Sequence, residues 1–245
     1  MLVTPWLVGA ALRADAEGPA VWLGEVSLLV FWLVAYLVFQ AASTWLKAAP
    51  VKRPRYRTPV IAYGILAAAQ GLGTLVALGP GALGWVPGFV PLLAVAWWLA
   101  WRRRERSLLG GVVTVAAASL LGLVARHPVP HVPDAVTLVA VAACFGYFAG
   151  TVLYVKTMIR ERGKPAWLAA SVGFHAAATG VCLAGLMAGG VASLAPLAAF
   201  FAATTVRALA MPLLARRVPI SPKTVGFAEI GFTAALVLAC LVPSL

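Results

Sequence analysis

The chain is a series of long apolar stretches separated by short polar connections. A transmembrane α-helix needs about 20 mostly apolar residues. The nine stretches cover residues 1–12, 21–45, 59–78, 83–101, 108–125, 135–155, 166–188, 194–215 and 224–241. This pattern predicts an all-α, polytopic membrane helix bundle of about nine transmembrane helices, in one integral membrane domain over residues 1–245. The first stretch is short, so we expect that the sequence begins inside its first helix.

Composition supports a membrane protein. Hydrophobic residues make up 62% of the chain and charged residues 11%, whereas about 25% of a soluble domain is charged. A net charge of +12 would indicate a nucleic-acid partner in a soluble protein, but here the cations lie between apolar stretches. Membrane topology accounts for them, and we expect no nucleic-acid partner.

The basic residues alternate from one connection to the next. Short cytoplasmic connections of membrane proteins are enriched in Lys and Arg. Only Arg13 and Arg126 lie in the odd-numbered connections, while the even-numbered ones hold Lys47, Lys52, Arg53, Arg55, Arg57, Arg102, Arg103, Arg104, Arg106, Arg160, Arg162, Lys164, Arg216, Arg217 and Lys223. We therefore expect a multi-pass protein of the bacterial plasma membrane with a cytoplasmic N-terminus and an outside C-terminus.

One face of the second apolar stretch is polar. Residues Tyr36, Gln40, Ser43, Thr44 and Lys47 recur at spacings of three and four, which places them on one side of a helix. We expect this face to look into the bundle. Polar side chains in membranes commonly bond helix to helix, and a wall that lines a ligand cavity is the other interpretation.

Two ionisable residues lie within the last two apolar stretches. Arg207 is about 13 Å inside Arg216, and Glu229 about 9 Å inside Lys223, at about 1.5 Å of rise per residue. An ionisable residue within a span normally faces the interior and has a partner. The spacing predicts a buried ion pair, which either fixes helix register or takes part in binding. His175, in the middle of its stretch, is expected to be a hydrogen-bonded core residue.

The sixth apolar stretch carries two polar stripes. Lys156 lies one turn before Arg160, and Tyr147, Thr151 and Tyr154 lie nearly opposite Lys156 on an ideal helix. Only one stripe can face the interior. A lysine at a helix end can instead extend its amine to the membrane interface.

The residues that commonly bind metals are scattered. The three cysteines, Cys144, Cys182 and Cys240, stand alone within apolar stretches, so we expect core residues rather than a disulfide framework. The seven Asp and Glu residues form no cluster, although a magnesium–diphosphate site needs several carboxylates. We predict no metal site and no cofactor, and an anion held directly by Lys and Arg.

Three segments resemble the YwiC-like family of bacterial membrane proteins. They are RPRYR at 53–57, RRRERSLL at 102–109 and GTVLYVKTMIRERG at 150–163. The resemblance spans most of the chain. Members of that family usually begin with a His-Gly-Ala-Trp segment before the first helix, which is absent here and is in keeping with a shortened start.

The layout is also similar, at the level of the fold, to the UbiA superfamily of intramembrane prenyltransferases. In those enzymes, segments after the second and sixth helices carry Asp-rich motifs that bind prenyl diphosphate through magnesium. Here Lys156, Thr157 and Arg160 stand where the second motif would have carboxylates or amides. The resemblance therefore implies the cavity of that superfamily, and the degenerate motifs argue against prenyl transfer.

Taken together, these features predict a UbiA-like bundle that binds an isoprenoid or another anionic lipid at its cytoplasmic face, with membrane lipids as partners. The expected ligand-binding residues are Gln40, Ser43, Thr44, Lys47, Arg53, Arg55, Tyr154, Lys156 and Arg160. If the protein is an enzyme, the resemblance implies a prenyltransferase-like intramembrane transferase. The alternatives are a small-solute or proton-coupled transporter that uses Arg207, Glu229 and His175, and a non-catalytic assembly partner of a membrane complex.

Overall fold

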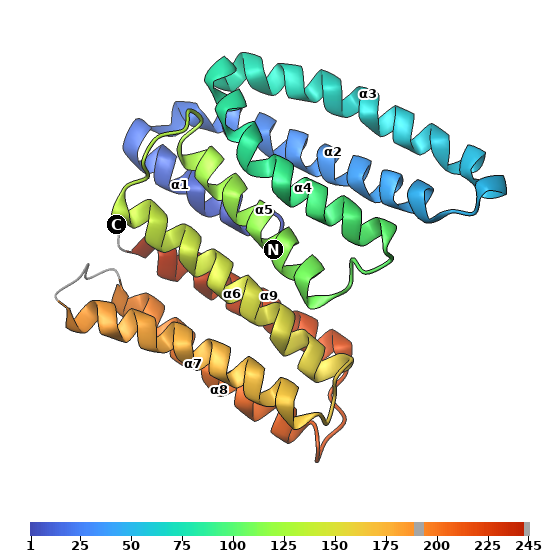
Figure 1. The fold of residues 1–245 in the computed structure, drawn as a ribbon. Helices are drawn as coiled ribbons and strands as arrows, with labels where there is room; N and C mark the ends of the chain where they lie inside the picture. The colour runs from blue at the N-terminus through green and yellow to red at the C-terminus, as the bar shows by residue number, and fades with distance from the viewer. Residues whose placement is uncertain (189–193, 243–245) are drawn as a thin grey trace. The chain divides into compact units, whose positions relative to one another are not determined.

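The computed structural model describes residues 1–188 and 194–242, and the regular secondary structure in this part of the chain is all helical. Its nine α-helices are α1 (Thr4–Glu17), α2 (Trp22–Lys47), α3 (Arg53–Leu78), α4 (Val86–Trp101), α5 (Leu108–Arg126), α6 (Ala135–Ile159), α7 (Pro165–Met187), α8 (Leu194–Leu214) and α9 (Pro222–Leu241) (Figure 1). The eight from α2 to α9 belong to segments long and apolar enough to cross a membrane. The predicted all-α membrane fold is confirmed.

Helix limits differ from the expected ones where proline or a polar residue is tolerated at a helix end. α3 begins at Arg53, six residues before the apolar stretch, because Pro54 lies in its first turn, where no backbone N–H is required. α4 begins only at Val86, after a 3₁₀ segment at Pro80–Trp85. α6 continues to Ile159, so Lys156 lies on the helix itself.

The chain divides into two compact units. Residues 2–137 hold α1–α5, and residues 138–245 hold α7–α9 and most of α6. Within the first unit α2 lies along α3, and α5 packs against α1 and α4; within the second, α8 lies along both α7 and α9. The single membrane domain over residues 1–245 stays a prediction.

α1 packs closely against α5 in the first unit. It has 14 residues, about 21 Å at 1.5 Å of rise per residue. A Cβ atom at Gly9 would lie 2.1 Å from the carbonyl oxygen of Gly122, so the two backbones touch as small residues allow in membrane helices. Trp6 is buried beside this contact and donates from Nε1 to the backbone oxygen of Glu25 at 3.0 Å.

Ion pairs join helices and connections within the first unit. Arg13 Nη1 donates to Glu25 Oε1 at 2.7 Å, and the Glu25 side chain is fully buried. Lys47, at the end of α2, pairs with Glu105 of the connection between α4 and α5. Each pair holds a charge that would be costly alone in a low-dielectric setting.

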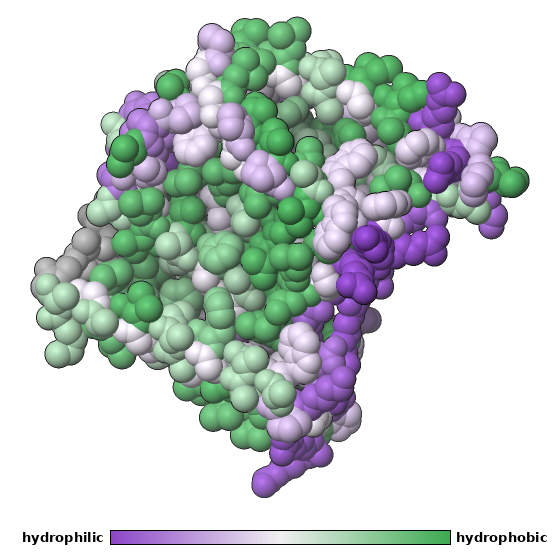
Figure 2. Space-filling model, viewed as in Figure 1, coloured by the Kyte–Doolittle hydropathy of each residue, from purple (hydrophilic) through white to green (hydrophobic). Residues whose placement is uncertain are grey.

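The outside of the helices is apolar. Large side chains such as Leu23, Ile65, Leu72 and Phe227 are more than half exposed. Figure 2 shows hydrophobic side chains along the helices and hydrophilic ones gathered at helix ends. This is the surface that a bilayer would cover.

Candidate functional site

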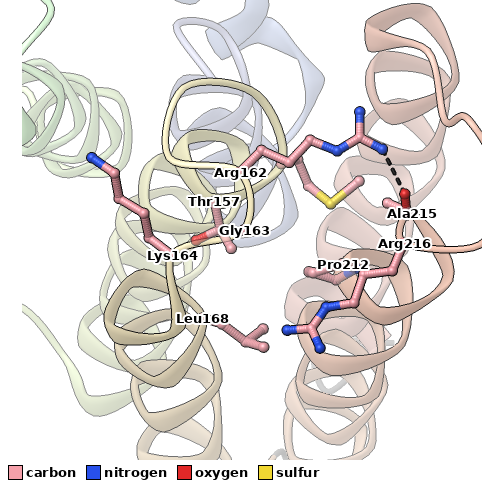
Figure 3. Close-up of a pocket in the computed structure, with 9 residues that line it drawn as sticks. Thr157, Arg162, Gly163, Lys164, Leu168, Pro212, Ala215 and Arg216 are labelled. Atoms are coloured by element: carbon pink, nitrogen blue, oxygen red, sulfur yellow. Dashed lines mark hydrogen bonds between the residues drawn. The ribbon is translucent and has the colours of Figure 1, made fainter.

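A pocket of about 160 Å³ lies at the end of α6 and α8, within the second unit (Figure 3). α6 ends at Ile159, and Gly163, with a backbone φ of 83°, lets the chain turn into α7. α8 ends beside this turn at Leu214, with Pro212 in its last turn. The lining residues are Thr157, Met158, Arg162, Gly163, Lys164, Leu168, Pro212, Ala215 and Arg216.

Two cationic side chains, those of Arg162 and Arg216, lie at the pocket, whereas the Lys164 side chain extends away from it (Figure 3). Arg162 Nη2 donates to the backbone oxygen of Ala215 at 2.6 Å, which ties the α6–α7 connection to the end of α8. Lys164 Nζ lies 2.7 Å from Glu161 Oε2. The side chain of Arg216 is exposed and has no hydrogen-bond or ion-pair partner among the described residues. A net positive charge therefore surrounds an opening that can admit an anion.

The inner part of the pocket is apolar. Met158, Leu168 and Pro212 contribute hydrocarbon surface. Thr157 is buried, and its Oγ1 atom lies 3.0 Å from the backbone oxygen of Leu153 and 3.1 Å from that of Trp167, so the single hydroxyl hydrogen is shared between these two acceptors. Cationic side chains therefore lie at the opening of the pocket, and apolar side chains line its inner part.

Three of the expected ligand-binding residues, Tyr154, Lys156 and Arg160, lie close to this pocket in the sequence but do not line it. The Lys156 Nζ atom is 5.8 Å from the centre of the Trp167 ring, and Arg160 is exposed. Neither is among the lining residues. Tyr154 is fully buried one turn inside Met158, packed with Ala208 and Val225.

The tyrosine stripe is the one that faces the interior of the second unit. Tyr147 and Tyr154 are fully buried. Tyr147 Oη donates to Glu229 Oε2 at 2.9 Å, and Thr151 Oγ1 donates to the same oxygen at 3.0 Å. The other oxygen of Glu229 accepts from Arg207 Nη1. The structure thus brings Arg207 and Glu229 together and adds two hydroxyls of α6 to the pair.

Aromatic rings enclose the Arg207 guanidinium. Its Cζ atom lies 4.4 Å from the ring centres of Tyr154 and Phe232 and 5.6 Å from that of Tyr147. A cation over ring faces gains about 2 kcal/mol or more when it is desolvated. The network joins α6, α8 and α9 and gives the second unit a polar core.

The expected polar face of α2 does not form a buried wall. Gln40 and Thr44 are exposed, and their bonds stay within α2: Gln40 Nε2 donates to Tyr36 Oη at 2.6 Å, and Thr44 Oγ1 to the backbone oxygen of Gln40 at 2.9 Å. Ser43 is buried, and Lys47 is held by Glu105. Gln40 and Thr44 are therefore exposed rather than buried in the first unit, and the expected role of this face in ligand binding stays a prediction.

The two expected ligand-binding arginines after α2 behave differently from each other. Arg53 lies 5.3 Å from the centre of the Trp45 ring and donates from Nε to the backbone oxygen of Ala48 at 3.3 Å. Arg55 is exposed. Both lie in the first unit, so they form no part of the pocket described above.

The histidines lie in two settings. His175 is buried, and its Nδ1 atom is 2.7 Å from the backbone oxygen of Ser171. His127 is buried after the end of α5, where burial, His131 and Arg126 hold its pKa below 6.5. Among the described residues, no three His, Cys, Asp or Glu side chains are grouped closely enough to hold a metal ion.

Sequence reasoning left Arg162, Lys164 and Arg216 out of the expected ligand set. The signal was present, because all three lie in the basic connections that were attributed to topology. The sequence does not show that the α6–α7 connection lies against the end of α8.

Comparison with known proteins adds a family. The family model described as "YwiC-like protein" matches residues 1–126, the stretch that holds α1–α5. No curated protein and no solved structure matches the chain. The segments at 53–57 and 102–109 lie inside the matched stretch and the segment at 150–163 lies outside it. The fold-level similarity to the UbiA superfamily stays a prediction.

Proposed function

The chain belongs to the YwiC-like protein family, and from this premise we propose that it is a multi-pass membrane protein that binds an anionic lipid headgroup in the pocket at the end of α6 and α8. The observation that carries the proposal is the pair of arginines, Arg162 and Arg216, at the opening of a pocket with an apolar floor (Figure 3). Spans of the required length support the membrane setting.

Size and charge favour a headgroup as the bound part. A pocket that encloses a whole drug-sized ligand measures about 300–1,000 Å³, and this one measures about 160 Å³. A lipid would therefore place its charged group here and leave its chains against the apolar helix sides.

Arg216 is the residue best suited to direct recognition. A guanidinium presents paired donors that match two oxygens of a phosphate, which an amine cannot do. Arg162 already uses one nitrogen on Ala215, and Lys164 is shared with Glu161. Phosphorylated isoprenoids and phospholipids share the phosphate headgroup, and the proposal covers this common chemistry without prenyl transfer.

The pocket is assigned to the cytoplasmic side, since two of the basic connections form it. This orientation is tested by single-cysteine labelling in intact cells on a background in which Cys144, Cys182 and Cys240 are serine. Arg217→Cys should resist a membrane-impermeant reagent until the membrane is broken, and Val132→Cys should react at once. The reverse pattern would invert the proposed topology.

Lipid binding is tested by native mass spectrometry of protein purified in mild detergent. Arg216→Ala should reduce retained anionic lipid about tenfold or more, because a bond to a charged group contributes about 1.5–3 kcal/mol. The matched control is Arg217→Ala, which removes the neighbouring exposed cation outside the lining. Equal retention by both variants would refute a specific site and leave only general attraction to anionic membranes.

A further inference from the structure

A second polar site lies deeper in the second unit, around Arg207. Glu229 is already satisfied by Tyr147, Thr151 and the Nη1 atom of Arg207. Arg207 itself is not, because its Nε and Nη2 atoms are buried without a hydrogen-bond partner among the described residues. Those two nitrogens form the side edge of the guanidinium, which in proteins binds one or two oxygens side by side.

Two further unpartnered polar groups lie on α6 and α7 of the same unit. Tyr154 is fully buried, its ring is 4.4 Å from the Arg207 Cζ atom, and its hydroxyl has no partner in the described chain. His175 of α7 is 1% exposed, and its Nε2 atom is 2.8 Å from the position of a Cβ at Gly150, one turn before Tyr154 on α6. Because a carbonyl only accepts, His175 Nδ1 donates to Ser171, and Nε2 is left as an unpartnered acceptor.

The chemistry of these groups defines what would satisfy them. Arg207 and Tyr154 offer donors, and His175 offers an acceptor. The charge of Arg207 is already balanced by Glu229, so a second anion would leave a net negative charge within the membrane interior, which is strongly disfavoured. The matching ligand is therefore an uncharged group whose oxygen accepts hydrogen bonds and whose hydrogen can be donated to His175. A hydroxyl group meets both conditions.

We propose that the Nε–Nη2 edge of Arg207, together with Tyr154 and His175, binds a hydroxyl group inside the membrane span. The hydroxyl belongs either to an internal water or to an uncharged lipid alcohol. Polar groups in a bilayer cannot find bulk solvent, so each that lacks a partner in the protein requires one from a ligand or an internal water. This site is independent of the headgroup pocket, since Arg207 precedes Pro212 of the pocket by five residues, about 7.5 Å along α8.

Two tyrosine variants test whether the site is occupied. Tyr147→Phe removes a hydrogen bond that is formed in the structure, and should lower the melting temperature by about 2–4 °C. Tyr154→Phe keeps the ring over Arg207 and removes only a hydroxyl without a protein partner. If a ligand hydroxyl binds there, the melting temperature should fall by a similar amount. An unchanged or higher melting temperature of Tyr154→Phe would overturn the proposal.

Two further measurements identify the source of the hydroxyl. Hydroxyl-radical footprinting should label the buried Tyr154 ring if a water is bound, and Arg207→Lys, which keeps the charge but lacks the side edge, should lose the label. Mass spectrometry of an organic extract should find a co-purified uncharged alcohol if the ligand is a lipid, reduced about fivefold in Tyr154→Phe. Absence of both the label and the alcohol would also refute the site.

Discussion

The ion pair between Arg207 and Glu229 should be a main determinant of the stability of the second unit. Glu229→Gln keeps the shape of the side chain and removes its charge, leaving Arg207 buried without a counter-ion. Loss of one partner of a buried pair costs about 3–5 kcal/mol. The Arg207 side chain is 4% exposed and that of Glu229 is 16% exposed, so we expect the lower end, about 3 kcal/mol. At about 2–4 °C per kcal/mol, the melting temperature should fall by about 6–12 °C.

The chain carries separate reporters for this experiment. All three cysteines lie within residues 138–245 and are buried, while Trp167 is the only tryptophan of the nine in that range. A thiol-reactive dye therefore reports the opening of α6–α9, and tryptophan fluorescence reports mainly α1–α5. Glu229→Gln should lower the temperature at which the cysteines react with the dye. It should lower the temperature of the tryptophan fluorescence transition by less.

A double substitution provides the control. Arg207→Met with Glu229→Leu removes both charges and restores an apolar interior, which is often neutral or stabilising. We expect the double variant to regain most of the loss measured for Glu229→Gln. A shift below about 2 °C in the single variant, or a double variant no more stable than the single one, would refute the claim that the uncompensated charge causes the loss.

Three further predictions concern the first unit and use tryptophan fluorescence. Gly9→Ala should cost about 1–3 kcal/mol, since its Cβ would lie 2.1 Å from a backbone oxygen of α5, whereas Gly64→Ala meets no atom within 4 Å and should be tolerated. Arg13→Ala should cost about 3 kcal/mol, because the fully buried Glu25 loses its cation; an unchanged melting temperature would contradict this. Burial holds the pKa of His127 below 6.5, so its contribution to stability is present above pH 6.5 and is lost as the pH falls through the lowered pKa. Melting at about pH 8 and about pH 5.5 should show this loss, and His127→Gln should reduce it.

The positions of helices along the chain could be predicted because bilayer thickness fixes the length of an apolar stretch. The limits of α5 and α9 agree with the stretches at 108–125 and 224–241 to within two residues. Limits were missed at α3 and α6, where Arg53 and Lys156 continue a helix beyond its apolar part. Charged side chains at a helix end can extend their charged groups to the membrane interface. The last helical turn therefore need not be apolar, and hydropathy does not locate the end of the helix.

The candidate site could be predicted only in part, since sequence gives depth along a helix but not the neighbour across it. Depth alone placed Arg207 and Glu229 at levels where they could meet. It did not reveal that Arg162 and Arg216 line one pocket, because that depends on two connections distant in sequence. The polar residues of α2 were assigned to the interior by periodicity, yet Gln40 and Thr44 are exposed.

α6 shows most clearly which features the sequence determined and which only the tertiary structure decided. The sequence by itself determined that Lys156 and the stripe of Tyr147 and Tyr154 lie on opposite sides of one helix, because the angle between residues is set by helix geometry. Only the tertiary structure decided which side is inside. Arg207 of α8 and Glu229 of α9 meet the tyrosine side, and a buried charge is stable only where its partners are gathered.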